Sequence, residues 1–409
     1  MGQRVKSIIV VGGGVIGISS ALSLQARGLA VTVVDPAGLR PASLGNAGHI
    51  AVEQVEPLAS AATLRALPRM LFSRGGPVAL PAPEIGAWLP FALRFARAAA
   101  PKRFAAGKRA LASLAAAAIP AWRAQLERVG AAELLLENGH YVVWESEKAA
   151  EQGRARWAAA DTGAVTHREA NATELASISA HLSAPLAGGL RFSGSAQIAD
   201  LDLLAAALVR GFEQAGGVRV HGAVASIAAL EVVLETGERL AADAVVVAAG
   251  AASGALLRPL GHKVPLIAER GYHLQAAETD WRLDLPPVVF EERAMIVTRF
   301  RSGLRAAGFF EFGRAASPPD RRKWARLRAH LRALGIKFAD PVEWMGARPT
   351  LPDYLPAIGR SRTGVLYAFG HQHLGLTLAA ATGEAVAALV AGERPPFDLE
   401  PFAIERFGR

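Results

Sequence analysis

A glycine-rich turn near the start of the chain is the feature that most constrains the fold. Residues 7–12, SIIVVG, are apolar and β-branched and end in glycine, which is typical of a buried parallel strand. A helix is predicted over 16–27 and a second strand over 30–34. This strand–helix–strand unit predicts that the fold begins with a parallel sheet.

The turn itself has the spacing G-x-G-x-x-G, with Gly12, Gly14 and Gly17. The first glycine permits a tight turn, the second lets the backbone approach a pyrophosphate, and the third lets the helix lie close to the strand. The N–H groups of the first helical turn, beginning at Val15 and Ile16, would then face the phosphates. The motif predicts a dinucleotide site.

Asp35 supports the same interpretation. It lies 21 positions after Gly14, at the end of the second predicted strand. An acid there can accept hydrogen bonds from ribose hydroxyls and repels a 2′-phosphate, which disfavours NADP. The motif does not separate FAD from NAD. Its place at the start of the chain, with other site elements scattered behind it, is common among FAD proteins.

Composition excludes several classes of protein. The 409 residues are 51% apolar, which is enough for two domains, or for one large domain with an insertion, with a substantial core. The absence of cysteine excludes disulfides, thiolate metal sites and thiol catalysis. The basic and apolar start runs into the glycine turn instead of a cleavage site, and polar residues interrupt every 18-residue window. We therefore expect a cytoplasmic protein without a spanning helix.

The net charge of +9 is concentrated in one region. Between Arg65 and Arg128 there are eleven Lys or Arg against Glu84 and Glu127, and 11 − 2 = +9. This region is also rich in Ala, Leu and Phe, and basic amphipathic helices of that kind can lie on an anionic membrane. One interpretation is peripheral contact of 65–128 with the inner membrane surface; the other is a solvated arginine-rich layer. No aromatic interleaving supports nucleic-acid binding.

The later sequence alternates between helical and strand patterns. Residues 56–130 are predicted to be mostly helical with several proline breaks, and GHYVVWES from 139 alternates as a strand does. A buried strand is predicted at 244–249. Apolar and polar residues alternate over 288–313, and glycines mark turns between the alternating runs, which indicates antiparallel sheet. A charged helix is predicted from Asp320 to Leu334. Two interleaved domains follow from this order.

The order of motifs resembles a known family. After the glycine motif come SLGNAGHI (43–50), AAGAAS, RGYHL, WMGARPTLPDYLPAIG and FGHQHLGLTLAAATGE. This order is similar to that of the D-amino-acid oxidase-type FAD oxidoreductases, above all the bacterial D-amino-acid dehydrogenase branch. ARPTLPDYLPAIG, at 347–359, is the most specific piece. NAGHIAVEQVEPLAS and GHQHLGLTLA most resemble the D-hydroxyproline dehydrogenases of hydroxyproline catabolism.

The resemblance implies a fold and a reaction. The fold is α/β, with an FAD-binding Rossmann-like domain interleaved with a substrate domain built on an antiparallel sheet. The implied boundaries are 1–55, 186–262 and 341–409 for the FAD-binding domain and 56–185 and 263–340 for the substrate domain. FAD would be bound without covalent attachment. Hydride transfer from the substrate Cα to flavin N5 would give an imine, with cis-4-hydroxy-D-proline or D-proline as the favoured substrate. Electrons would pass to a quinone or another acceptor.

The resemblance also implies residues that bind the substrate. Arg348, in GARP, matches the family's carboxylate-binding arginine, and its planar guanidinium suits a bidentate grip. Arg270 and Tyr272 are expected to form the second wall of the pocket, with a core position as the alternative for Tyr272. Glu269 and His273 lie on the other face of the same strand and are expected to point away.

The segment around NAGHI is expected to pass the flavin. His49 would contact substrate or flavin, and its alternative role is a backbone hydrogen bond. Ser43, Asn46, Ala47 and Gly48 would wrap the cofactor through backbone groups. Further along the chain, Val224, Ala249 and Gly250 are also assigned to the cofactor, the last two because DAVVVAAGAAS is a strand ending in small residues.

The stretch GHQHLGLTLAAATG, 370–383, predicts a helix N-terminus at the flavin. A helix beginning near Leu376 would stabilise the negative charge of reduced flavin with its first N–H groups. The cofactor contacts expected here are Gly370, His371, Leu374, Gly375, Leu376 and Thr377. His373 is expected to contact substrate or accept the amine proton, with a pKa near working pH. A metal site at H-x-H is not expected, because no third ligand lies nearby in sequence.

Three alternatives remain open from the sequence. The chain could act on another D-amino acid or secondary amine, as a dehydrogenase or as a true oxidase. It could be an NAD-dependent dehydrogenase, or a flavoprotein subunit that is active only with partner chains. The oligomeric state is not predicted.

Overall fold

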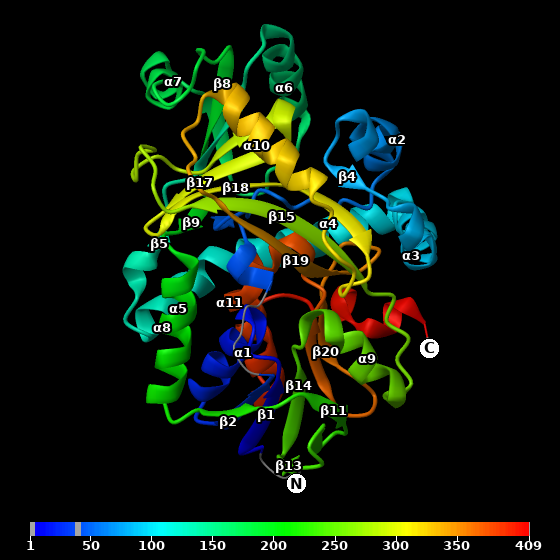
Figure 1. Ribbon diagram of the computed structural model, residues 1–409. Coiled ribbons are helices and arrows are strands. Elements are labelled where there is room, and N and C mark those ends of the chain that lie inside the picture. Colours follow the sequence, from blue (N-terminus) through cyan, green and yellow to red (C-terminus); the bar gives the residue numbers. More distant parts are fainter. Residues whose placement is uncertain (1–4, 37–41, 409) are drawn as a thin grey trace.

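The computed structural model describes residues 5–36 and 42–408, which build two large sheets (Figure 1). The lower sheet in the figure has six strands among these residues, in the order β10-β2-β1-β14-β21-β20. Its strands are β1 (Ser7–Val11), β2 (Ala30–Asp35), β10 (Val218–His221), β14 (Ala244–Val247), β20 (Ala357–Arg360) and β21 (Leu366–Phe369). Every pairing is parallel except that of β20 with β21. The predicted parallel strands at the start of the chain and at 244–249 are confirmed.

The two faces of this sheet enter different cores. Ile8 and Val10 on β1 join a core with the helices α1 (Val15–Gln25), α8 (Leu201–Gln214) and α11 (Gly375–Ala391). Ile9 and Val11 point the other way, toward a small sheet of β11 (Val224–Ile227), β12 (Glu231–Leu234) and β13 (Arg239–Ala241). Side chains of a strand alternate between faces, so a continuous apolar run is what this two-sided burial requires.

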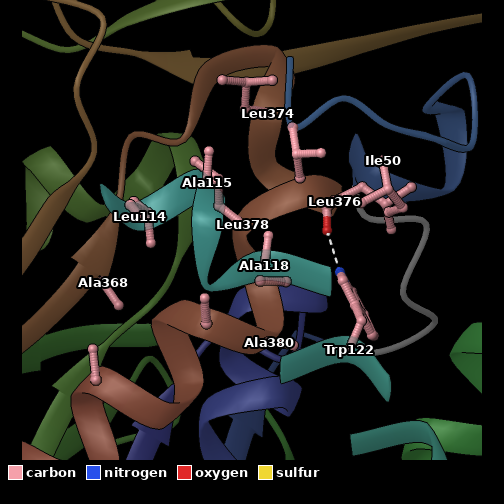
Figure 2. Close-up of a cluster of buried hydrophobic side chains, with 14 of the residues drawn as sticks. Ile50, Leu114, Ala115, Ala118, Trp122, Ala368, Leu374, Leu376, Leu378 and Ala380 are labelled. Atoms are coloured by element: carbon pink, nitrogen blue, oxygen red, sulfur yellow. Dashed lines mark hydrogen bonds between the residues drawn. The ribbon is translucent and has the colours of Figure 1, made fainter. Parts of the chain in front are cut away.

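Helix α11 is the central helix of the first core. A Cβ on Gly383 would lie 2.6 Å from the backbone oxygen of Ser19, so α11 and α1 touch with no side chain between them. On another side, the indole N–H of Trp122 donates to the Leu376 oxygen at 2.9 Å (Figure 2). Trp122 belongs to α5 (Ala118–Arg128), which follows α4 (Pro101–Ala116). Helices α4 and α5, which the sequence assigns to the substrate domain, thus place their buried faces in the same core as α11.

The upper sheet has nine strands in the described residues. Its order is β19-β15-β18-β17-β16-β6-β8-β7, with β4 paired to β18. The strands are β4 (Val78–Ala79), β6 (His140–Trp144), β7 (Thr166–Glu169), β8 (Gly188–Ser193), β15 (Ile267–Ala276), β16 (Val288–Phe290), β17 (Met295–Phe300), β18 (Gly303–Gly313) and β19 (Val342–Thr350). The sheet is mainly antiparallel, as predicted, with parallel pairs β16–β6 and β18–β4. Strands β8 and β19 were assigned to the FAD-binding domain, and their pairing in this sheet corrects those boundaries.

Helices and a small sheet surround this upper sheet. Helix α10 (Arg322–Leu334) covers one face with Trp324, Leu327 and Leu331. The remaining helices are α2 (Ala61–Met70), α3 (Ile85–Ala98), α6 (Glu147–Ala159), α7 (Ala172–Ser179) and α9 (Ser253–Leu257). A three-stranded sheet of β3 (His49–Ile50), β9 (Ala196–Ile198) and β5 (Leu135–Leu136) lies between the two large sheets (Figure 1).

One helix in the described residues is long and apolar enough to cross a membrane. It spans Gln372–Ala391, and 78% of its apolar 18-residue window is buried inside the protein. Such a helix is the ordinary core helix of a globular fold, which agrees with the central position of α11.

The contact between α11 and α1 gives a test of the packing. Gly383→Ala should lower the free energy of unfolding by about 1–3 kcal/mol, because the new methyl group would enter the backbone of α1. Gly86→Ala, in α3, is the matched control: its Cβ would meet no atom within 4 Å. That variant should be neutral or stabilised by up to about 1 kcal/mol. Urea unfolding of both variants measures the difference, and equal values would contradict the packing.

Candidate functional site

A cavity of about 620 Å³ lies where the two large sheets meet. Its size is within the usual range for small-molecule sites. The glycine turn, the end of β2, the start of β11 and the segment after β14 form one part of the wall. The end of β19 and the segment from β21 into α11 form the other part. The cavity is thus lined by both sheets.

The N-terminus of α1 faces this cavity with its N–H groups available. Gly14 caps the helix in an extended conformation, with no side-chain cap and no acid in the first turn. Gly12 has φ +104°, and a Cβ there would lie 2.5 Å from the Ala248 oxygen. A Cβ on Gly17 would lie 1.8 Å from the Gly12 oxygen. Gly12 and Gly17 therefore have the roles that the motif predicts, and unpaired N–H groups at a helix N-terminus favour a phosphate.

Asp35 closes this end of the cavity. Its carboxylate accepts a hydrogen bond from the Gly13 N–H at 2.6 Å. Partial burial raises the pKa of Asp35, and the Gly13 hydrogen bond opposes that rise. The second carboxylate oxygen remains able to accept from a ribose hydroxyl.

The N-terminus of α11 faces the same cavity. The helix begins at Gly375 after a short 3-10 turn, again with no side-chain cap and no acid in its first turn. A Cβ on Gly375 would meet only the His371 Cβ, at 3.7 Å. His371 places one ring nitrogen 3.0 Å from the Thr382 hydroxyl, while its Nδ1 and the Gln372 Oε1 find no hydrogen-bond partner in the described residues. Such buried polar atoms call for a ligand or water.

Most of the predicted cofactor contacts lie on this cavity. Those in its wall are Gly12, Gly14, Val15, Ile16, Asp35, Ser43, Asn46, Val224, Ala249, Gly250, Gly370, His371, Gly375 and Leu376. Gly17, Ala47, Gly48, Leu374 and Thr377 stand outside the wall. Gly17 serves helix packing, and the Thr377 hydroxyl accepts from the Ala51 N–H at 3.0 Å. Leu374 is part of the hydrophobic core.

Arg348 lies in the wall of the cavity, as predicted. It stands opposite Glu269 across the β15–β19 pair, and its Nη1 lies 3.0 Å from the Glu269 Oε1. The other carboxylate oxygen of Glu269 accepts from the Tyr354 hydroxyl at 3.0 Å and from Thr350 at 3.3 Å. A Cβ on Gly271 would lie 2.3 Å from the Arg348 Nη2, so the guanidinium lies directly over that glycine. Glu269 and Gly271 thus position the Arg348 guanidinium directly, and Thr350 and Tyr354 hold Glu269 in place.

The prediction that Arg270 and Tyr272 form the second wall is wrong. Both are buried on the opposite face of β15, where Arg270 pairs with Glu311 at 2.7 Å and Tyr272 donates to the same carboxylate. Lys323 of α10 also reaches Glu311, at 2.6 Å. This ion cluster fixes α10 to the sheet. Burial, together with the hydrogen bond to Glu311, raises the pKa of Tyr272 above its ordinary value.

Glu269 and His273 lie on the face of β15 that was expected to point away from the site. In the structure this face contacts Arg348 of the cavity wall and the segment at Gly45. Alternation placed Glu269 and His273 on a common face but could not say which face was inward. The His273 ring stacks on Trp344, with centroids 4.9 Å apart, and its Nδ1 lies 3.0 Å from the Gly45 oxygen. A Cβ on Gly45 or Gly346 would fall about on the Trp344 ring, at 2.0 and 1.8 Å. Gly45 and Gly346 make room for the Trp344 ring, so these two glycines and the tryptophan are the trace of this packing in the sequence.

His373 is in the cavity wall, as predicted, and its pKa is lowered. Its Nε2 lies 2.7 Å from the Gln54 Oε1. Burial lowers the pKa of His373 to about 4, and the nearby Glu269 opposes this only in part. This lowering runs against the expectation of a histidine with a pKa near working pH, because burial disfavours the charged ring.

His49 is not on the cavity wall, which corrects its predicted contact with substrate or flavin. Its ring lies 4.4 Å from that of His140, and its Nε2 is 3.6 Å from a carboxylate oxygen of Glu53. All three side chains are buried. Burial lowers the pKa of His49 to about 4 and raises that of Glu53 to about 8. At pH 7 the group is a neutral histidine beside a protonated acid.

This buried acid predicts a pH-dependent stability. The unfolded chain releases the Glu53 proton near pH 4.5, whereas the folded chain keeps it to about pH 8. Between these values the native state binds more protons, so the wild-type stability should fall as pH rises, by up to about 1.4 kcal/mol per pH unit. Glu53→Gln removes this titration, and its stability relative to wild type should rise from pH 4.5 to pH 8.

Urea unfolding across that range measures the difference, with Glu151→Gln, an exposed acid on α6, as the control. A difference between wild type and Glu53→Gln that does not change with pH would contradict a protonated Glu53.

The residues of the cavity fit FAD. Two uncapped helix N-termini, the close turn at Gly12 and the second carboxylate oxygen of Asp35 suit a pyrophosphate, an anionic ring and a ribose. The α1 end would hold the phosphates. The α11 end, next to Arg348, would hold the flavin ring.

The sequence matches the profile of the FAD dependent oxidoreductase family, DAO, over residues 7–389. A D-amino-acid oxidase of Bradyrhizobium diazoefficiens is 31% identical over 421 residues, covering 98% of this chain and 99% of the relative. A D-amino acid dehydrogenase of a Methylobacterium species is 29% identical over 424 residues, with 98% and 99% covered.

Solved structures share the fold. The crystal structure of glycine oxidase from Geobacillus kaustophilus has a TM-score of 0.72 and 22% identity, with 99% of each chain covered. That of iminodiacetate oxidase from a Chelativorans species has a TM-score of 0.70 and 21% identity, with 97% and 98% covered.

Proposed function

This chain belongs to the DAO family of FAD-dependent oxidoreductases, and from that premise we propose that it oxidises a D-amino acid to the corresponding imine. Its relatives of about 30% identity, named D-amino-acid oxidase and D-amino acid dehydrogenase, align over nearly their whole length and support this substrate class. Bound FAD would supply the chemistry, by accepting a hydride from the substrate Cα.

The position of Arg348 is the observation that carries the proposal. A guanidinium in the cavity wall can bind the substrate carboxylate through two parallel N–H groups, because only one nitrogen is used by Glu269. Glu269, Thr350 and Tyr354 hold the group in one orientation. A fixed carboxylate restricts where the Cα–H can point, which is the main requirement for hydride transfer.

His373 is proposed to contact the amino group. Gln54 offers an oxygen to the ring Nε2, so that nitrogen carries the proton and Nδ1 is left as an acceptor. A neutral imidazole can accept a hydrogen bond from the substrate nitrogen without adding positive charge. This favours the neutral amine, whose lone pair assists loss of hydride from the adjacent carbon.

Within this class we favour cis-4-hydroxy-D-proline or D-proline as the substrate, and the support is the sequence similarity in NAGHI and GHQHLGLTLA. Another D-amino acid or secondary amine is the alternative. We also propose that a quinone or another acceptor, and not mainly oxygen, removes the electrons. Stoichiometric hydrogen peroxide during turnover would show an oxidase instead.

Anaerobic mixing of the purified holoprotein with a panel of D- and L-amino acids tests the proposal. The flavin absorbance should bleach with cis-4-hydroxy-D-proline or D-proline well before it bleaches with other D-amino acids. Faster bleaching by an acyclic D-amino acid would keep the reaction and reject the proline-type substrate. No bleaching by any D-amino acid would reject the proposed function.

Glu269→Gln tests the orientation of Arg348. The change removes the charge that holds the guanidinium while keeping the shape of the side chain, so KM should rise about tenfold, near the lower end of the 1.5–3 kcal/mol assigned to a charged hydrogen bond. The control is Glu343→Gln on β19, the strand that carries Arg348; the Glu343 carboxylate pairs with Arg328 and is not part of the cavity wall. Steady-state kinetics with a soluble dye as acceptor gives both constants, and an unchanged KM for Glu269→Gln would contradict the role of the pair.

A further inference from the structure

Helix α3 exposes a stripe of large aliphatic side chains. Ile85, Leu89 and Leu93 are 50%, 44% and 57% exposed. They are four residues apart, so they lie on one face of the helix. Single exposed leucines are ordinary in proteins, but a contiguous row of them marks an interaction surface.

Exposed basic side chains lie on α3 and on the elements next to it in the chain. Exposed cations on α2, α3, their connection and the first turn of α4 are Arg65, Arg69, Arg74, Arg94, Arg97, Lys102 and Arg103. None of them forms an ion pair with an acid in the described part of the chain. The single acid of this segment is Glu84, which is buried and accepts from the Arg314 N–H and the Ser317 hydroxyl. The segment therefore presents positive charge that the protein does not neutralise.

Two cavities open beneath the same helices. One, of about 80 Å³, is walled by α2 and α3 and is almost wholly apolar, with Trp88, Phe91 and Tyr354 among its lining. The other, of about 470 Å³, lies beside α3 and α4 and has Arg94, Arg97 and Arg103 in its wall. The arginines in this wall suit a phosphate group, and the apolar recess lies beneath the helix that carries the aliphatic stripe.

We propose that this α2–α3 face, residues 61–103, docks on an anionic phospholipid bilayer. The aliphatic stripe would enter the headgroup region, and the arginines would contact lipid phosphates. This face is smaller than the basic region 65–128 identified in the sequence. The second half of α4 and the whole of α5 are excluded from it because they pack against α11. Figure 1 shows α2 and α3 together on one flank of the molecule.

The chemistry of the face favours a membrane over other polyanions. A nucleic acid would gain from the cations but not from three exposed aliphatic side chains in a row. An acidic protein partner would also use the cations, and an interface of that kind is an outcome of the test. The proposal does not depend on the identity of the amino acid that the enzyme oxidises.

Co-sedimentation of the holoenzyme with vesicles tests the docking surface. Wild type should bind vesicles of phosphatidylcholine and phosphatidylglycerol, should bind phosphatidylcholine alone far less, and should dissociate as salt is raised. Leu93→Glu should weaken binding at least about tenfold, because it removes the most exposed member of the stripe and adds a like charge to the lipid. Leu230→Glu is the matched control, since Leu230 is also 57% exposed but lies on the β12 hairpin.

Charge reversal and activity complete the experiment. Arg94→Glu with Arg97→Glu should abolish the preference for phosphatidylglycerol. All variants should keep wild-type flavin reduction by substrate, which separates loss of docking from failure of the proposed reaction. Equal binding to both vesicle types, or wild-type binding by Leu93→Glu, would overturn the proposal. A change in oligomer size in Leu93→Glu, with wild type not binding vesicles, would assign the face to a protein interface instead.

Discussion

The backbone contact between α1 and α11 is the constraint on which the site depends. Because Gly383 has no side chain, its helix lies against the Ser19 backbone, and the two helices are fixed side by side under the six-stranded sheet. Both then begin at the same cavity, each with an uncapped first turn. Two helix N-termini facing one space make it favourable for anionic groups at both ends, which is what an extended dinucleotide requires.

The other half of the site depends on a buried carboxylate. Glu269 is 1% exposed, and an ionised acid at such a position is tolerated only with good partners. The partners of Glu269 are Arg348, Tyr354 and Thr350. The Glu269–Arg348 pair in turn presents the guanidinium to the cavity in one orientation. The strand pairing of β15 with β19 sets this geometry, so the cation that we propose binds the substrate is positioned by the sheet and not by a loop.

The sequence predicted the parts of the fold that depend on local pattern. The glycine spacing, the buried strands, the start of α11 and the position of Arg348 in the cavity wall all follow from short stretches. What it missed depends on distant residues. Alternation along β15 defines two faces, but whether Glu269 or Arg270 faces the cavity depends on Glu311 and Lys323 from other elements. His49 was misplaced for the same reason, since only the fold brings Glu53 and His140 to its ring.

The most direct test of the account is binding of a carboxylate that cannot react. Pyrrole-2-carboxylate is a planar analogue of a proline imine, and its binding can be followed by the shift of the flavin absorbance. We expect wild type to bind it and Arg348→Ala to bind it roughly 10–100-fold more weakly, as is usual for loss of a charged hydrogen-bonded pair. The flavin content of both proteins should be equal. An unchanged Kd in Arg348→Ala would show that the substrate carboxylate is held elsewhere.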